Sequence, residues 1–404
     1  MMTEDLNKNC ISYLDKLCNV IGERPVGSVG NQKAADFIEK EMKLLGWETE
    51  TPVFKALDWL DGGAALSAGG ETFVVSASPY SLGYSGETEL VSVTNVNELT
   101  KADATGKILF LHGDIAAEQL MPKNFVFYNP DEHKEIVALL EQSGARAIIC
   151  ATGRNAALAG GVYPFPLIED GDFDIPSVYM TEEEGKKLLP FVGVKVLLKS
   201  DAKRIESKGC NVIGRKGDLS ADKIVVTAHL DAKIGTPGAI DNATGVIVLL
   251  LLARLLDYYS GDLQIELVAF NGEDYYAVPG QMNYIAANQD NFNRIMLNIN
   301  IDGAGYKDGP SALSFYGLPS LIENKAREVL AYSEGVIEGT QWSQGDHSIF
   351  IQYGRPALAA TSQWFADHID SQTITHTPED KPEIVDCQKL IELAQTLNTL
   401  IRKL

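Results

Sequence analysis

The chain has 404 residues, 45% of them hydrophobic and 22% charged, and its 55 acidic against 34 basic side chains give a formal net charge of −21 at pH 7. This length predicts more than one domain, because single cores rarely grow beyond about 250–300 residues. No apolar run reaches the roughly 18 residues of a membrane span and no Lys/Arg cluster is present to neutralise phosphates, so we expect neither a membrane nor a nucleic acid as a partner.

The N-terminal residues "MMTEDLNKNC" start with acids and lack the basic start and apolar core of a signal peptide. Across the whole chain, five cysteines are scattered without a CxxC pair, which indicates neither a disulfide framework nor a cysteine–zinc site. We therefore expect a reducing, cytoplasmic location. The cysteines are Cys10, Cys18, Cys150, Cys210 and Cys387.

Two helices are predicted between about residues 9 and 46. Apolar residues recur at helical spacing in "ISYLDKLCNVI" and "AADFIEKEMKLLGW", and Gly46 fits a helix stop. Between them, "GERPVGSVG" has no helical period and lacks the GK[ST] ending of a phosphate-binding loop. We interpret it as a turn without chemistry.

Residues 57–202 are predicted to form a separate, mainly β domain. Short alternating segments such as "ETFVVSAS" and "GKILFLHG" are broken by glycine and polar clusters, with one helical stretch, "EHKEIVALLEQSGA". His112 and His133 have no partner at metal-ligand spacing, so we interpret both as structural. The segment divides the remaining chain into residues 1–56 and 203–404.

From about residue 203, apolar strands alternate with helical patterns. "KIVVTAH", "LQIELVAF" and "IMLNINID" are continuous apolar strands, separated by helices such as "ATGVIVLLLLARLLDYY". Strands that are apolar on both faces are typical of a parallel sheet covered by helices. The predicted fold class is α/β, with a mixed, mostly parallel sheet flanked by helices and the β domain as an insertion.

Polar side chains follow these strands at the point where each strand ends. Sites in open α/β sheets form beyond the carboxyl ends of the strands. A single aspartate there is an ordinary helix N-cap, but several carboxylates at one edge would repel one another unless a cation lay among them. The residues at this edge are His229, Asp231, Asp241, Glu273, Asp274 and Asp302, and His376 follows later in "THTPED".

The ligand types narrow the choice of metal. Two neutral imidazoles with several carboxylates and no thiolate suit zinc, with cobalt or manganese as alternatives, better than calcium or magnesium. Five ligands are too many for one tetrahedral zinc but suit two ions that share a carboxylate. We predict Asp241 as the bridge, with His229 and Asp302 on one ion and Asp274 and His376 on the other.

Two further acids would complete the chemistry. Asp231 lies two residues after His229 on the same face of an extended backbone, where it can accept the other imidazole N–H. Glu273 adjoins a ligand yet points elsewhere by alternation, and a carboxylate beside a metal-bound water is the general base that hydrolysis requires. The alternative for Glu273 is a supporting or surface acid.

Taken together, "AHLDA", "GAIDNATG", "FNGEDYY", "NIDGAG", "GDHSIF" and "THTPED" resemble the di-zinc exopeptidase family that includes bacterial leucyl aminopeptidases and glutamate carboxypeptidase II. The similarity covers the N-terminal helices and the chain from about residue 205 to its end. It implies the same five ligands, Asp241 as bridge, Glu273 as base and Asp231 behind His229. It also implies a strained or cis peptide between Asp241 and Asn242.

Other segments extend or depart from this resemblance. "TGKILFLHG", "LEQSGARAIICAT" and "IPSVYMTEEEGKKLL" are similar to the protease-associated domain that some family members carry as an insertion. The family usually has Glu-Glu-Gly-Leu where this chain has Glu273, Asp274 and two tyrosines, so the second acid is one methylene shorter. In "GDHSIF", Asp346 and His347 either contact substrate or brace the loop.

These observations favour a metal-dependent exopeptidase acting on peptides, most simply an aminopeptidase. A carboxypeptidase would need a fixed cation for the substrate α-carboxylate, and Arg24, Arg154 and Lys233 are candidates. A one-zinc glutaminyl cyclase and a non-catalytic binding protein like the transferrin receptor are rivals on the same fold. His368 is either a gate residue or a surface residue, and self-association into a homo-oligomer stays open.

Overall fold

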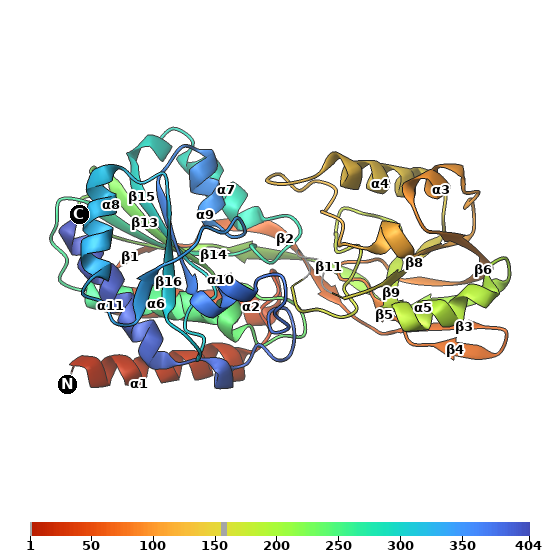
Figure 1. Cartoon of the computed structure of the whole chain (residues 1–404), viewed down its shortest axis with the longest axis horizontal. Helices are drawn as coiled ribbons and strands as arrows, with labels where there is room; N and C mark the ends of the chain where they lie inside the picture. Colours follow the sequence, from red (N-terminus) through yellow and green to blue (C-terminus); the bar gives the residue numbers. More distant parts are fainter. Residues whose placement is uncertain (1, 155–159) are drawn as a thin grey trace. The chain divides into compact units, whose positions relative to one another are not determined.

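A computed structural model describes residues 2–154 and 160–404. The chain forms two compact units, labelled by element in Figure 1: residues 1–56 with 208–404, here the first unit, and residues 57–207, the second unit. Our sequence-based boundary at residue 202 differs from this division by five residues. The reason is strand β11 (Lys203–Cys210), which pairs with β2 (Val53–Leu60) and carries the chain from the second unit back to the first.

An eight-stranded sheet forms the centre of the first unit. Its middle strands β14, β13, β15 and β18 are mutually parallel, whereas β12 pairs antiparallel with β14 and β16 pairs antiparallel with β18. The predicted mixed, mostly parallel sheet is therefore confirmed. In spatial order the strands are β1 (Glu48–Glu50), β12 (Val212–Lys216), β14 (Gln264–Phe270), β13 (Lys223–His229), β15 (Ile295–Ile301), β18 (Ala357–Ser362), β16 (Ser311–Tyr316) and β17 (Val336–Glu338).

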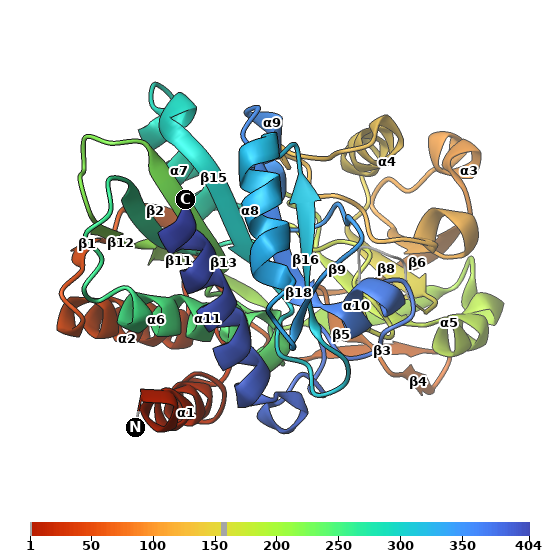
Figure 2. The same cartoon turned by 60° about the vertical axis from the view of Figure 1, so that its left-hand side comes forward.

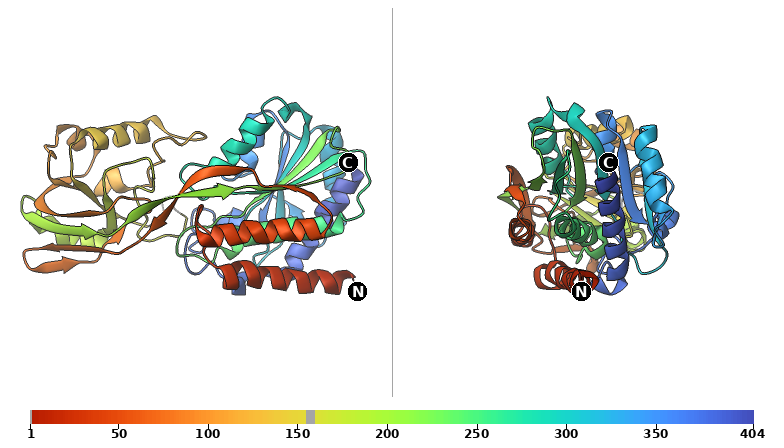
Figure 3. Two further views of the ribbon diagram at one scale, coloured as in Figure 1. Left: turned by 180° about the vertical axis from the view of Figure 1, so that it is seen from behind. Right: turned by 90° about the vertical axis from the view of Figure 1, so that its left-hand side faces the viewer.

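Helices cover both faces of this sheet (Figures 2 and 3). α6 contacts β13 and β14 beneath it and α1, α2 and α11 around it, which explains why its sequence is apolar on every side. On the other face, α7 and α9 meet through Tyr284 and Phe350, whose ring centroids are 6.1 Å apart. The helices are α1 (Met2–Leu14), α2 (Val29–Leu44), α6 (Thr244–Leu255), α7 (Pro279–Asn288), α8 (Ser320–Leu330), α9 (His347–Gln352), α10 (Gln363–His368) and α11 (Cys387–Lys403).

The three central parallel strands end at one level. β13 ends at His229, which pairs in register with Phe270, the last residue of β14. Thr227 of β13 pairs with Asn300, one residue before the end of β15. The loops that follow β13, β14 and β15 therefore leave the sheet side by side, at the edge where the sequence predicts the site.

The second unit contains another eight-stranded sheet, and its described residues form three α-helices rather than the one predicted. α3 and α5 have only six and seven residues, too few for a clear helical period. The strands in spatial order are β4 (Glu71–Phe73), β3 (Ala64–Ala68), β10 (Lys195–Ser200), β6 (Tyr84–Val93), β7 (Ile108–Leu111), β8 (Ala147–Thr152), β9 (Ser177–Thr181) and β5 (Ser76–Ala77). The helices are α3 (Val96–Lys101), α4 (Asp131–Gln142) and α5 (Glu182–Leu188).

Both histidines of the second unit make local hydrogen bonds. The buried His133 accepts the amide N–H of Met121 at Nδ1, and its Nε2 lies 3.0 Å from Glu118 Oε1. His112 Nε2 lies 2.7 Å from the hydroxyl of Ser92. Their surroundings agree with the structural roles predicted for them. Within residues 2–154 and 160–404, no helix is long and apolar enough to cross a lipid bilayer.

A buried charge network crosses the sheet of the first unit. Glu266 is 1% exposed and accepts hydrogen bonds from Arg215 Nε at 2.8 Å, Lys223 Nζ at 3.1 Å and Tyr284 Oη at 2.6 Å. Burial alone would raise the pKa of Glu266, but Lys223, Tyr284 and Arg215 hold it below its ordinary value. The carboxylate is therefore ionised and fully paired in the fold.

We expect Glu266→Gln to lower the free energy of unfolding at pH 7 by about 3 kcal/mol, because it leaves two buried cations short of a partner. Because the folded pKa is depressed, the wild-type advantage is complete above the unfolded pKa of about 4.3 and is lost as pH falls through the folded pKa. Urea unfolding from pH 7 to pH 3 measures both effects. Glu50→Gln, which removes the half-exposed second partner of Arg215, is the control and should cost less than about 1 kcal/mol.

Candidate metal centre

The five predicted ligands converge at the carboxyl edge of the sheet, around the carboxylate of Asp241. Its Oδ1 lies 3.1 Å from His229 Nε2, which in turn is 3.6 Å from Asp302 Oδ1. Its Oδ2 lies 3.1 Å from His376 Nε2, which is also 3.1 Å from Asp274 Oδ1. Each oxygen of Asp241 thus faces a different imidazole and a different second carboxylate, as expected of a carboxylate between two ions.

The donor atoms in this group fit a metal ion. His229 Nε2 and Asp274 Oδ2 are buried and make no hydrogen bond, although Nε2 lies close to Asp241 Oδ1. Ligand atoms of His229, Asp241 and Asp274 all lie within 4.8 Å of one another. Buried polar atoms are almost always satisfied, so buried donor atoms without a hydrogen bond in one such cluster indicate a cation. Imidazole nitrogen with carboxylate oxygen is a donor set of zinc.

Like charges are crowded around this point. Burial and the carboxylates of Asp274 and Asp302 raise the pKa of Glu273 well above its usual range. Burial would lower the pKa of His229 and His376, but the neighbouring carboxylates, above all Asp302 for His229 and Asp274 for His376, hold both pKa values well above normal. A bound cation relieves such crowding of acids, which again fits a metal.

Asp231 has a different principal contact from the one predicted. His229 Nδ1 lies 3.2 Å from the backbone carbonyl of Asp231 and 3.7 Å from its carboxylate Oδ1, so the carbonyl is the nearer acceptor for the ring. The carboxylate instead accepts the amide N–H groups of Gly272 at 2.7 Å and Asp274 at 3.0 Å. These two amides flank Glu273, so Asp231 fixes the loop that carries the predicted base.

Buried asparagine side chains hold both ends of the same loop. Asn31 and Asn271 donate to each other's side-chain oxygens at 2.8 and 2.9 Å. Asn211 accepts the backbone N–H of Asn271 and donates to the carbonyl of Gly280, at the far end of the loop. Both ends of the segment that holds Glu273 are therefore anchored to the sheet and to α2.

The two candidate substrate residues lie at the start of α9. Asp346 accepts a hydrogen bond from Gln281 Nε2 at 2.9 Å, and its other oxygen is buried without a partner. Burial raises the pKa of Asp346 to about 7. His347 is held by the carbonyl of Trp342 at 3.1 Å and by the rings of Trp342 and Tyr316, and burial lowers its pKa to about 4. Of the two roles considered for His347, this geometry favours holding the loop in place over contacting substrate.

Arg24 cannot serve as an anchor for a substrate carboxylate. The residue is 1% exposed, and its guanidinium donates only to backbone carbonyls. Arg154 belongs to the second unit, with its guanidinium 4.7 Å from the ring centroid of Tyr163. Lys233 is partly buried in the loop after β13. Arg24 is therefore excluded as the residue that would bind the substrate α-carboxylate in a carboxypeptidase.

His368 has the surface position that we considered as one of its two alternatives. It is exposed at the end of α10, where its ring stacks on Trp364 at a centroid distance of 4.5 Å. Its Nδ1 lies 2.7 Å from the Trp364 carbonyl. These contacts are local to the helix.

Asp380 is a site residue that sequence reasoning missed. It is fully buried and accepts the backbone N–H of Ile240 at 2.7 Å and of Asp241 at 3.0 Å. The signal available was its position four residues after His376 in "THTPED". The peptide between Asp241 and Asn242 is cis, as the resemblance implied.

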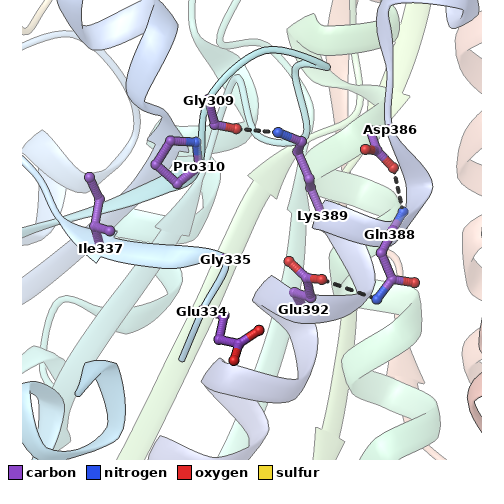
Figure 4. A pocket seen from close by; sticks show the side chains of 9 residues that line it. All are labelled: Gly309, Pro310, Glu334, Gly335, Ile337, Asp386, Gln388, Lys389 and Glu392. Carbon is purple, nitrogen blue, oxygen red and sulfur yellow. Dashed lines mark hydrogen bonds between the residues drawn. The ribbon is translucent and has the colours of Figure 1, made fainter. Parts of the chain in front are cut away.

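A separate hollow of about 430 Å³ shares no residue with the metal centre (Figure 4). Several of its polar groups already have partners: the backbone N–H of Gln388 donates to Asp386, its side-chain amide donates to Glu392, and Lys389 donates to the carbonyl of Gly309. We assign it no chemistry.

Comparison with known proteins shows which family the chain resembles. Residues 211–401 match the sequence model of Peptidase family M28. Aminopeptidase YwaD of Bacillus subtilis (strain 168) is 24% identical over 407 residues, covering 95% of this chain and 81% of that protein. The probable lipoprotein aminopeptidase LpqL of Mycobacterium tuberculosis is 26% identical over 347 residues, covering 82% and 65%.

The fold agrees with this match. The crystal structure of BSAP, a zinc aminopeptidase from Bacillus subtilis, superposes with a TM-score of 0.76 at 22% identity, covering 98% of this chain and 95% of that one. The segment that matches the family contains all five candidate ligands together with Glu273 and Asp380. Over residues 211–401, this chain is similar to peptidase family M28.

Proposed function

We propose that this chain is a zinc-dependent aminopeptidase that hydrolyses N-terminal peptide bonds at a centre of two ions. The observation that carries the proposal is the position of Asp241, whose two oxygens face the separate pairs His229 with Asp302 and His376 with Asp274. The relatives named as aminopeptidases, one of them a zinc enzyme, support the substrate class and the metal.

When bound, the ions supply Lewis acidity and lower the pKa of a water molecule. The chain supplies the rest. Glu273, which burial and nearby carboxylates make a strong proton acceptor, takes the proton from the attacking water and returns it to the leaving nitrogen. Asp231 holds Glu273 in place through the amides on either side of it.

The charge around the site favours a substrate amine over a substrate carboxylate. Asp346 presents a buried carboxylate oxygen that makes no hydrogen bond; burial raises the pKa of this carboxyl group, and the charge of His229 opposes that rise. Arg24, a buried cation in the turn before α2, already donates to backbone carbonyls and so does not bind a substrate carboxylate. An α-ammonium group is therefore the terminus that this site would attract.

The test is zinc content per chain together with activity on four kinds of substrate: aminoacyl 4-nitroanilides, their N-acetylated forms, peptides cleaved at the C-terminus, and peptides with N-terminal glutamine. We expect two zinc ions and cleavage of aminoacyl 4-nitroanilides, with no cleavage of the N-acetylated forms. Cleavage only of C-terminal residues would establish the carboxypeptidase alternative, and one zinc with cyclisation of N-terminal glutamine would establish the cyclase. If the protein holds no zinc after reconstitution, the result would favour the alternative of a non-catalytic binding protein.

We expect Asp231→Asn to lower kcat about 10- to 100-fold while leaving two zinc ions bound, because the amide keeps the shape but loses one acceptor for the loop amides. Steady-state kinetics and metal analysis measure the two quantities. Asp257→Asn, at the partly exposed surface, is the control. An unchanged kcat in Asp231→Asn would show that the loop holds Glu273 without this carboxylate.

The remaining proposals come from the sequence. We propose that residues 57–202 form a protease-associated-like domain. We also propose that the protein is cytoplasmic, since none of its five cysteines is in a disulfide. Cell fractionation tests the location, and light scattering tests whether the chain forms a homo-oligomer.

A further inference from the structure

Arg24 closes the base of the loop that joins two of the candidate ligands, His229 and Asp241. Its Nε donates to the carbonyl of Leu230 at 3.0 Å, directly after His229. Its Nη1 and Nη2 donate to the carbonyls of Pro237 at 2.8 Å and Gly238 at 2.7 Å, just before Asp241. One guanidinium thus joins the beginning and the end of the loop.

The rest of the guanidinium is tied to the N-terminal part of the chain. Nη1 also donates to the carbonyls of Leu17 and Gly22, at 3.2 and 2.8 Å. The backbone carbonyl of Arg24 accepts from Asn31 Nδ2 and from the amide of Ala232. The segment that we interpreted as a turn without chemistry is therefore the support on which the first ligand loop rests.

The turn before Asp241 is built to receive this side chain. Gly238 has a φ of 57°, and a Cβ there would lie 2.8 Å from Arg24 Nη2 and 2.4 Å from the Cβ of Ala232. The guanidinium therefore lies directly against the turn. A lysine offers three donors at a single point and cannot reproduce a planar fork that reaches both ends of the loop.

Asp380 holds the same stretch of backbone by its amides. Its two oxygens accept the N–H groups of Ile240 and Asp241 at 2.7 and 3.0 Å. Arg24 binds the carbonyl of Gly238 and Asp380 binds the amide of Asp241, so three successive peptide groups before the ligand are fixed. Asp380 also lies four residues from His376, so it connects the loops of two ligands.

We propose that Arg24 and Asp380 are positioning residues that set the carboxylate of Asp241 for metal binding, although neither is itself a ligand. Both bind backbone groups of the segment before Asp241 rather than the Asp241 side chain itself. The inference rests on the proposed function, because it takes Asp241 to be a metal ligand.

The experiment compares zinc affinity, measured by competition with a chelating dye, in full-length wild type, Arg24→Lys and Asp380→Asn. We expect the dissociation constant for zinc to rise about 10- to 100-fold in both variants, the range typical of groups that orient metal ligands. Far-UV circular dichroism of the zinc-free proteins should be unchanged. Arg215→Lys is the matched control: this half-buried arginine bonds to Glu266 and Glu50, and its replacement should leave zinc affinity at the wild-type value.

The outcomes separate this inference from the proposed function. Wild type without zinc affinity would overturn the proposed function. Wild type with tight zinc binding, and folded variants that bind zinc equally well, would overturn the positioning role alone. If Arg24→Lys does not fold, Asp380→Asn decides; if neither folds, both residues are general folding determinants and the specific role is wrong.

Discussion

Glu273→Gln should lower kcat by about 10³-fold while two zinc ions stay bound. The amide keeps the size and hydrogen-bonding shape of the side chain but cannot accept the proton of the attacking water. Glu273 is not among the five candidate ligands, so zinc content should not change. Steady-state hydrolysis of an aminoacyl 4-nitroanilide and elemental analysis of the same sample measure both quantities.

Two further variants make this result specific. Glu273→Asp keeps a carboxylate one methylene further from the water, so it should recover part of the lost kcat. Glu323→Gln on α8, whose carboxylate pairs with Arg327 at the surface, should match wild type. If Glu273→Gln loses zinc together with activity, or keeps full activity, Glu273 is not the base.

The candidate ligands could be predicted because their signal is local and repeated. His229 ends a continuous apolar strand, Asp274 and Asp302 come shortly after such strands, and parallel strands bring these positions to one edge. The alternation of strand and helix that predicts the parallel sheet is also local. These features needed only the order of the elements along the chain.

Arg24 shows what could not be predicted. Its partners are backbone carbonyls, and three of them, at Leu230, Pro237 and Gly238, lie more than 200 residues away in sequence. Every residue has a backbone carbonyl, so no residue type in the sequence shows which carbonyls Arg24 binds. The same reasoning applies to Asp231, whose carboxylate was expected on an imidazole and is bound instead to two amides of another loop.

Asp241→Asn should have the largest effect of any single change at the centre. The asparagine amide offers one ligating oxygen where the aspartate carboxylate offers two. One of the two predicted ion sites therefore loses the ligand that it shares with the other. The remaining site keeps an oxygen ligand but loses its negative charge. We expect zinc content to fall from two ions to less than one per chain, and kcat to fall by at least about 10³-fold.

The comparison with Asp302→Asn shows whether Asp241 bridges. Of the two imidazoles, Asp302 pairs with that of His229, 3.6 Å from its Nε2, so its loss should release one ion and leave the other bound. Added zinc stabilises only a protein that binds it, so the melting temperature should rise with zinc in wild type, rise less in Asp302→Asn and hardly change in Asp241→Asn. If Asp241→Asn keeps one ion at wild-type affinity, Asp241 serves one site only. Loss of both ions from a single substitution is the result that requires a shared carboxylate, because only a shared ligand couples the two sites through one side chain.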